Sequence, residues 1–215
     1  VTDTSKALVE TLYLDYLDAL NKHFEVSPYL LGWRACIGDF GLIAPMYAHL
    51  GRDPAPLRIM QQRAVNVYRW VERMNRQDQD VPEFFSAGDD YLADDEVPDS
   101  LLAVLRLLAE DFVPETRAAA DGINQWLVEN KPEPGVAAER MLGTIEFSVR
   151  DQVITSVAQP YRFYLLQRVQ DTYAGMSAEE RTSVDKMLSD SNMSELLNIR
   201  LNRRVERSDN LEVWG

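Results

Sequence analysis

Apolar residues recur at helical spacing along most of this chain, and the pattern predicts a mostly helical protein. In the N-terminal stretch they return at every fourth position, which places them on one face of an amphipathic helix: Leu8, Leu12, Tyr16, Leu20 and Phe24. A second stripe begins after Pro56 and predicts another helix: Leu57, Met60, Ala64, Val67, Val71 and Met74. The first part of the chain is therefore expected to bury one face of each helix.

The most apolar stretch lies between these two helices, at residues 29–50, with the sequence YLLGWRACIGDFGLIAPMYAHL. Its second half carries apolar residues on one stripe, which predicts a buried helix: Phe40, Ile43, Tyr47 and Leu50. Pro45 lies inside this stripe and would clash with the carbonyl of Gly41, so a kink is expected there. Gly51, with Pro54 after it, is expected to end the helix.

Prolines divide the second half of the chain into shorter predicted helices. A helix over residues 99–112 is expected to stop at Pro114, and another should follow over residues 115–129. These two helices are expected to pack as an antiparallel pair. Pro160 opens a further helix, and Ser177 begins a short one as the first residue of a capping box.

A change of period marks residues 144–157. Apolar residues there alternate with polar ones in two runs, which is typical of strands: Ile145, Phe147 and Val149, then Val153, Thr155 and Val157. Arg150 and Asp151 can turn the chain between the runs, so a small β-hairpin is expected. Residues 202–215 are mostly polar and are expected to wrap the surface. Their apolar anchors are Leu211, Val213 and Trp214. The predicted fold class is all-α with one small hairpin.

Residues 77–98 are expected to form a long loop, because acidic residues stand among Pro and Gly without periodicity. Clustered carboxylates raise calcium binding as an alternative, but the ~12-residue loop with a central Gly and a closing Glu is absent. Zinc needs three or four ligands, and neither His23 nor His49 has a His or Cys neighbour at ligand spacing. We therefore expect no metal site. Four apolar residues predict that the loop folds back onto the body: Phe84, Phe85, Tyr91 and Leu92.

Charge and composition narrow the function classes. The 22 basic and 35 acidic residues give a formal charge of −13, which argues against nucleic acid and against an anionic membrane surface as a partner. A single cysteine excludes an intrachain disulfide and favours a cytoplasmic protein. No apolar run approaches the ~20 residues that a membrane-spanning helix needs. The chain begins with Val, so we expect a processed product or a piece of a longer protein.

The best-defined local motif is a helix start at Cys36 and Asp39. An acid three residues after the cap residue can accept a hydrogen bond from the cap's backbone N–H, and it interacts favourably with the helix dipole. The thiol of Cys36 is a poor acceptor, which weakens the other half of this capping box. A nucleophilic role for Cys36 is the alternative, but the sequence offers no base beside it. We therefore assign both residues a structural role as a helix cap.

This stretch resembles the C-terminal helical domain of the glutathione S-transferase family. The likeness covers residues 28–75 and consists of Leu31-Gly32, the box formed by Cys36 and Asp39, and Phe40 at the start of an apolar helix. In that family the box is a folding element and takes no part in catalysis. The resemblance therefore implies a fold for this part of the chain.

The resemblance also implies a division of labour between two domains. In the family, a thioredoxin-like domain binds the co-substrate glutathione and stabilises its thiolate, while the helical domain walls the pocket for the electrophile. Residues 1–135 would be the helical domain, and residues 136–215 a hairpin and helical extension packed on it. The pocket wall is expected at Tyr13, Tyr16 and Trp33. This chain shows no thioredoxin-like pattern, so we expect it to hold no catalytic residue and to be inactive alone.

The function implied by the resemblance is the substrate-side domain of a glutathione S-transferase-like protein, which conjugates or otherwise processes a small hydrophobic electrophile with glutathione. Its partner would be a thioredoxin-like domain, in the same chain or in another. The family resemblance further implies a homodimer. Two alternatives from other classes stay open: a non-catalytic helical protein-interaction module and a hydrophobic-ligand carrier built around the aromatic residues of the first helix.

Overall fold

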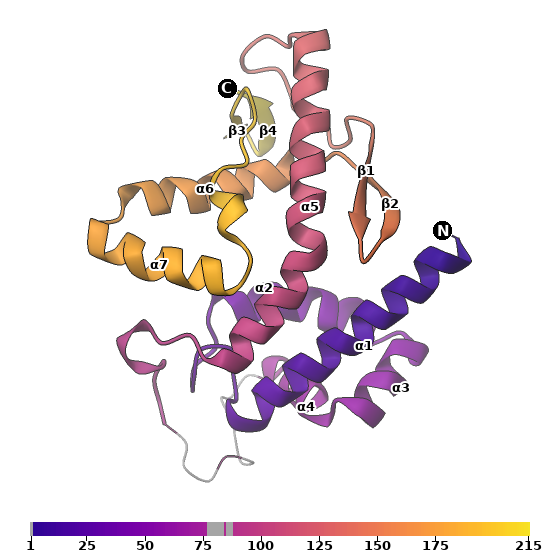
Figure 1. The fold of residues 1–215 in the computed structure, drawn as a ribbon, viewed down its shortest axis with the longest axis vertical. Coiled ribbons are helices and arrows are strands. Elements are labelled where there is room, and N and C mark those ends of the chain that lie inside the picture. The colour runs from indigo at the N-terminus through magenta and orange to yellow at the C-terminus, as the bar shows by residue number, and fades with distance from the viewer. Residues whose placement is uncertain (1, 77–83, 85–87) are drawn as a thin grey trace. The chain divides into compact units, whose positions relative to one another are not determined.

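The computed structural model describes residues 2–76, 84 and 88–215. Helices make up most of this part of the chain, together with two antiparallel β-hairpins (Figure 1). The expectation of a mostly helical fold is confirmed. The chain forms two compact units, residues 1–107 and residues 108–215, and the boundary between them falls inside the long helix α5 (Asp99–Asn130).

The first unit is built around its long N-terminal helix. Its elements are α1 (Asp3–Val26), α2 (Ile37–Pro45), the π-helical turn η1 (Met46–Leu50), α3 (Pro54–Arg63), α4 (Val65–Met74), the 3₁₀ turn η2 (Ala93–Asp95) and the start of α5. The predicted first helix is confirmed, and the Thr2 side chain caps it by accepting a hydrogen bond from the backbone N–H of Ser5. At the core, Phe24 of α1 stacks on Trp70 of α4 with ring centroids 5.0 Å apart.

The second predicted helix is divided in the structure. Its apolar stripe runs on through Ala64, but Ala64 leaves the helical conformation (φ −135°, ψ 61°), so α3 and α4 are separate helices. The backbone N–H of Asn66 donates a hydrogen bond to the side-chain oxygen of Asn21 at 2.9 Å. Asn21 belongs to α1 and supplies an acceptor for the first turn of α4, whose N–H groups have none within the helix. Because this acceptor is distant in sequence, the local pattern could not predict the break.

The apolar helix within residues 29–50 starts at the Cys36 cap and ends at Gly51 as predicted, but its burial was predicted wrongly. Its α-helical part ends at Pro45, a π-helical turn follows, and Gly51 closes it. Phe40 is 63% exposed and Tyr47 is 40% exposed, whereas Met46 is buried. Periodicity shows that residues share a face of a helix, but it does not show what covers that face.

Pro114 does not divide the chain. α5 runs through it without interruption, so the predicted antiparallel pair of helices over residues 99–129 is wrong. A proline inside a helix costs about 3 kcal/mol. Buried apolar side chains hold the helix on both sides of it: Ala109 and Val113 before, Ala119 and Ile123 after. Burying several such side chains outweighs the loss of one backbone hydrogen bond.

The second unit combines the C-terminal part of α5 with two hairpins and two helices. Its elements are β1 (Thr144–Val149), β2 (Gln152–Val157), α6 (Tyr161–Gly175), α7 (Ala178–Asp190), the 3₁₀ turn η3 (Ser194–Leu197), β3 (Val205–Ser208) and β4 (Leu211–Trp214). The predicted hairpin is confirmed, and Arg150 and Asp151 form its turn with φ of 47° and 63°. Both predicted helices are also present, and Ser177 with Glu180 forms the expected capping box.

The C-terminal residues form a second hairpin, where the sequence predicted a polar segment that wraps the surface. β3 and β4 pair antiparallel around Asp209 and Asn210, which have φ of 46° and 64°. Asp and Asn are the non-glycine residues that tolerate this conformation best, so this dipeptide was the signal for the turn. Trp214 is fully buried and stacks on Trp126 at 5.9 Å, whereas Leu211 is 59% exposed and does not anchor the chain.

Candidate functional site

The side chain of Asp39 is fully buried and connects three segments of the first unit. Its carboxylate accepts hydrogen bonds from the backbone N–H of Cys36 at 2.9 Å, from the backbone N–H of Leu30 at 3.2 Å and from the indole Nε1–H of Trp70 at 2.9 Å. The first bond is the acid half of the predicted capping box. Hydrogen bonds to a charged acceptor are about twice as strong as neutral ones. Asp39 therefore fixes the segment before α2 as well as the helix start.

Cys36 occupies the cap position of α2 as a free, half-buried thiol. Burial raises the pKa of this thiol above its ordinary value. Only the thiolate is an effective nucleophile, so a raised pKa makes the side chain less reactive at neutral pH. These properties favour the structural role of Cys36 over the nucleophilic one.

Gly32 shapes the segment that leads into α2, at a position that requires glycine. Its φ is +109°, and an added Cβ would lie 2.9 Å from the backbone nitrogen of Leu92. This close approach lets the backbone N–H of Leu92 donate to the carbonyl of Leu31, and that of Trp33 donate to the carbonyl of Asp90, both at 3.0 Å. The predicted return of the acidic loop onto the body is thus confirmed at its described end.

Phe84 from the same loop packs on two side chains of the first unit. Its ring meets Trp33 edge to face with centroids 5.7 Å apart, and the guanidinium of Arg73 lies 5.7 Å from its centre. Phe85 and the acidic residues 78, 80 and 83 lie outside the described residues. Among those that are described, no group of three or more His, Cys, Asp or Glu could hold a metal ion.

Two buried basic side chains contact the backbone of residues 28–29, in the segment that precedes α2. Arg73 is 4% exposed, and its Nη2 donates to the carbonyl of Pro28 at 2.9 Å. His23 is fully buried, with Nε2 3.3 Å from the carbonyl of Tyr29 and Nδ1 2.9 Å from the hydroxyl of Ser100. A carbonyl only accepts, so Nε2 carries the hydrogen and Nδ1 accepts from Ser100. Burial lowers the pKa of His23 and keeps the ring neutral.

The three residues predicted to wall a ligand pocket lie in different surroundings. The hydroxyl of Tyr13 donates to the carbonyl of Pro56 at 3.1 Å, and burial raises the pKa of Tyr13 to about 12. Tyr16 is half-buried on α1. Trp33 is half-buried against Gly88, where an added Cβ would lie 2.6 Å from the indole Cδ1. These contacts tie Tyr13 and Trp33 to separate segments, and their role as ligand contacts stays a prediction.

An exposed apolar stripe runs along α2 and η1. We call it the α2 face, and it consists of Ile37, Phe40, Ala44 and Tyr47. The spacing of three or four residues puts them on one side of the helix, and Ile37 is 91% exposed. Gly41 lies on the same side, with open space where a Cβ would stand. The most apolar helix of the first unit therefore presents apolar side chains to solvent.

The second unit contains an apolar hollow of about 570 Å³, lined by residues of α6, α7 and η3. We call it the α6–α7 hollow. Tyr161, Leu165 and Val169 of α6 form one wall, and Met187 and Leu188 of α7 belong to the other. The sequence pattern predicted both as ordinary amphipathic helices. The apolar residues of α6 extend around more of the helix than one buried face needs, which was the missed signal.

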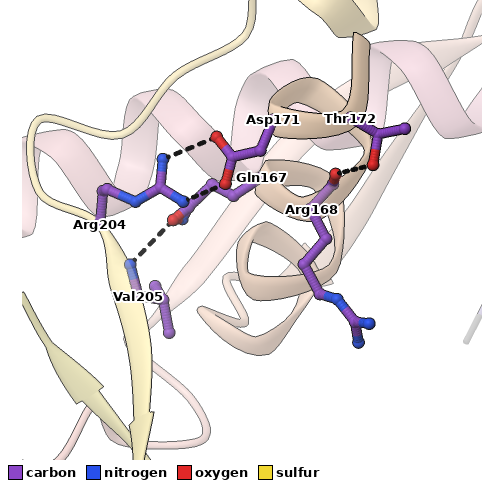
Figure 2. Close-up of polar contacts among 6 residues, drawn as sticks. All are labelled: Gln167, Arg168, Asp171, Thr172, Arg204 and Val205. Atoms are coloured by element: carbon purple, nitrogen blue, oxygen red, sulfur yellow. Dashed lines mark hydrogen bonds and ion pairs between the residues drawn. The ribbon is translucent and has the colours of Figure 1, made fainter. Parts of the chain in front are cut away.

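Polar contacts also connect α6 to the C-terminal hairpin (Figure 2), through residues of α6 that do not line the hollow. Arg204 donates two hydrogen bonds to the carboxylate of Asp171, at 3.1 and 2.6 Å, and the backbone N–H of Val205 donates to the side-chain oxygen of Gln167 at 3.0 Å. The hydrogen bonds from Arg204 lower the pKa of Asp171. These contacts fix the rotation of α6 about its axis.

No family model, curated protein or solved structure matches this chain. Its function therefore has to be inferred from three features: the buried Asp39 cap, the α2 face and the α6–α7 hollow. None of the described helices is both long and apolar enough to cross a lipid bilayer.

Proposed function

We propose that this chain is the substrate-side helical domain of a glutathione S-transferase-like protein and acts together with a thioredoxin-like domain. The observation that carries the proposal is the α2 face beside the buried Asp39 cap. Three hydrogen bonds hold Asp39, so α2 starts at a fixed place although Ile37 and Phe40 are exposed. Apolar patches on the surface of soluble proteins mark interaction sites. The resemblance of residues 28–75 to the glutathione S-transferase family implies a thioredoxin-like domain as the partner that covers the α2 face.

The proposed reaction is attack by the thiolate of glutathione on an electrophilic carbon of a small hydrophobic molecule. A carbon–sulfur bond forms, the leaving group departs with its bonding electrons, and the thiol proton passes to solvent. The thioredoxin-like domain binds glutathione and stabilises the thiolate. This chain supplies the apolar wall, with Tyr13, Tyr16 and Trp33 as the proposed contacts. Two of its potential reactive groups are engaged structurally: His23 is buried and hydrogen-bonded, and the thiol of Cys36 has a raised pKa.

A conjugation assay on the protein purified from its native source tests this proposal. The protein is kept with any domain or chain to which it is joined, and the reaction of 1-chloro-2,4-dinitrobenzene with glutathione is followed by absorbance. Phe40→Asp is expected to lower the rate about tenfold or more, because it puts a charge into an apolar contact. Val128→Asp is the matched control, since Val128 on α5 is 63% exposed, as Phe40 is, and it should retain the activity.

Two results would contradict the proposal. One is the absence of any glutathione-dependent product with several classes of electrophile. The other is an equal effect of Phe40→Asp and Val128→Asp on the rate, since the α2 face would then have no special part in the reaction. Unfolding curves of both variants show whether either loss comes from misfolding.

Protein association without catalysis is the second candidate, and the 91% exposure of Ile37 favours it. In this case the α2 face would bind another protein, and Phe40→Asp would abolish that complex. The native protein would then show no retention on immobilised glutathione. The homodimer implied by the family resemblance belongs to the first candidate, and sedimentation velocity measures it directly.

A further inference from the structure

The α6–α7 hollow has a wall that is apolar and exposed along its whole length. Tyr161, Leu165 and Val169 stand four residues apart on α6, and between 44% and 60% of each residue is exposed. Side chains at this spacing form a continuous stripe on a helix. Such a stripe on a helix of a soluble protein is normally covered.

The rest of the lining includes two side chains that can adapt their shape, Met176 and Met187. Met176 at the end of α6 and Met187 of α7 both line the hollow, together with Val184 and Leu188. Methionine is unbranched and polarisable, and it fits ligands of different outline. The hollow opens to solvent, so a small molecule can enter without unfolding the unit.

Three polar side chains of the lining have partners within the protein. Arg162, the charged side chain among the described lining residues, pairs with Glu115 at 2.6 Å. The hydroxyl of Tyr173 donates to Asp185 at 2.7 Å, and that of Thr172 donates to the carbonyl of Arg168 at 2.9 Å. Transferring a charged group into such surroundings costs several kcal/mol, on the order of the buried-ion penalties known for proteins. The chemistry of the hollow therefore favours an uncharged occupant.

One end of the hollow adjoins a more polar depression. Gln159 and Tyr161 line both the apolar hollow and a second one of about 470 Å³. The second hollow also carries Glu139, Arg140 and Glu212. Two carboxylates against one guanidinium disfavour an anionic group at this end. A hydroxyl or amide can form hydrogen bonds there without that repulsion.

We infer that the α6–α7 hollow binds an elongated, uncharged apolar molecule whose hydrogen-bonding end lies near Gln159. Its volume is within the range of about 300–1,000 Å³ that is usual for small-molecule sites. The contacts of α6 with Arg204 and with Val205 of β3 (Figure 2) hold the apolar stripe in place before the ligand arrives, which lowers the cost of ordering on binding. This site is separate from Tyr13, Tyr16 and Trp33, none of which lines it, so it does not depend on the proposed transferase function.

A fluorescence titration of the full chain with the neutral probe N-phenyl-1-naphthylamine tests the inference. We expect saturable binding with one site per chain. Dodecanol and dodecanoate, each below its critical micelle concentration, then compete with the probe. They carry the same alkyl chain and differ in the charge of the end group, so dodecanol should displace the probe at a concentration about tenfold lower or more.

A matched pair of variants tests whether the probe binds in the α6–α7 hollow. Val169→Asp puts a carboxylate into the apolar wall and should weaken probe binding about tenfold or more. Val128→Asp introduces the same group on α5 at a similar exposure, 63% against 60%, and Val128 is not one of the lining residues. It should bind the probe like the wild type. Both positions are exposed, so both variants are expected to fold, and circular dichroism checks this.

Four outcomes would contradict the inference. The first is the absence of saturable probe binding. The second is an equal effect of the two variants on the affinity for the probe. The third is a wild-type dimer that Val169→Asp dissociates and Val128→Asp does not, with no probe bound, because a second copy of the chain would then be the occupant. Preferred displacement by dodecanoate would contradict the assignment of an uncharged ligand.

Discussion

The indole Nε1–H of Trp70 donates a hydrogen bond to the carboxylate of Asp39 at 2.9 Å, and both side chains are fully buried. Trp70 also stacks on Phe24 of α1. The acid that starts α2 is therefore joined, through α4, to the aromatic core of the first unit. A capping residue has become part of the core.

Replacing Asp39 by Ala tests this relationship. The variant leaves the N–H groups of Leu30, Cys36 and Trp70 without their acceptor. Leu30 and Trp70 are buried and Cys36 is half-buried, and each buried unsatisfied donor costs about 1–3 kcal/mol. We expect the free energy of unfolding, measured by urea denaturation, to fall by about 3 kcal/mol or more. Trp70→Phe, which removes one donor and part of the ring, should cost less than Asp39→Ala. An unchanged urea midpoint for Asp39→Ala would refute the assigned role.

Cys36→Ser should stabilise the protein. Sulfur is a poor hydrogen-bond acceptor, whereas the serine hydroxyl is among the best capping groups. The acid half of the box, from the Cys36 N–H to Asp39, is already present at 2.9 Å. We expect a gain of about 0.5–1 kcal/mol in the free energy of unfolding. A loss of stability would mean that packing of the half-buried sulfur matters more than the cap.

Two of the helical glycines, Gly41 in α2 and Gly122 in α5, should respond in opposite ways to replacement by Ala. A Cβ at Gly41 meets open space, whereas one at Gly122 would lie 2.8 Å from Cγ2 of Ile145. Gly41→Ala should raise the free energy of unfolding by about 0.5–1 kcal/mol, because Ala favours the helix. Gly122→Ala should lower it, because overpacking costs about 1–3 kcal/mol. Thermal unfolding of both variants checks the contrast, and equal shifts would argue against an open α2 face.

His23 should make stability depend on pH. Burial holds its folded-state pKa below the ordinary value of 6.5, so the unfolded chain binds the extra proton first. The His23 contribution is therefore complete above about pH 6.5 and is lost as the pH falls below that value, by at most about 1.4 kcal/mol per pH unit. The nearby Asp39 charge opposes the shift. The free energy of unfolding is measured by urea denaturation at several pH values between 5 and 7. It should change less with pH in His23→Gln than in His49→Gln, whose site is exposed. Equal slopes would contradict the assignment.

Local chemistry made some features of this chain predictable from the sequence. The Ser177 box, the Arg150–Asp151 turn and the first helix each depend on residues close together in the chain, and all three are present. The break at Ala64 depends on Asn21, which is 45 residues away from the Asn66 that it caps. The continuity of α5 through Pro114 likewise depends on burial by distant residues. Such long-range partners leave no local pattern.

In the candidate sites, too, local contacts could be predicted and long-range contacts could not. The Cys36–Asp39 cap could be identified from its spacing, and one of its bonds is confirmed. The partnership of Asp39 with Trp70 could not, because it joins residues 31 positions apart. Exposure was the hardest property to infer, since the apolar stripe of Phe40 and Tyr47 is identical in sequence whether it is covered or not.

Binding of glutathione tests the central claim most directly. Isothermal titration calorimetry of the protein from its native source, with its natural partners or domains attached, measures it without a choice of electrophile. The proposed function predicts saturable binding with one glutathione per copy of this chain. No heat of binding at millimolar glutathione, from a preparation that unfolds cooperatively, would contradict the transferase proposal and favour protein association through the α2 face.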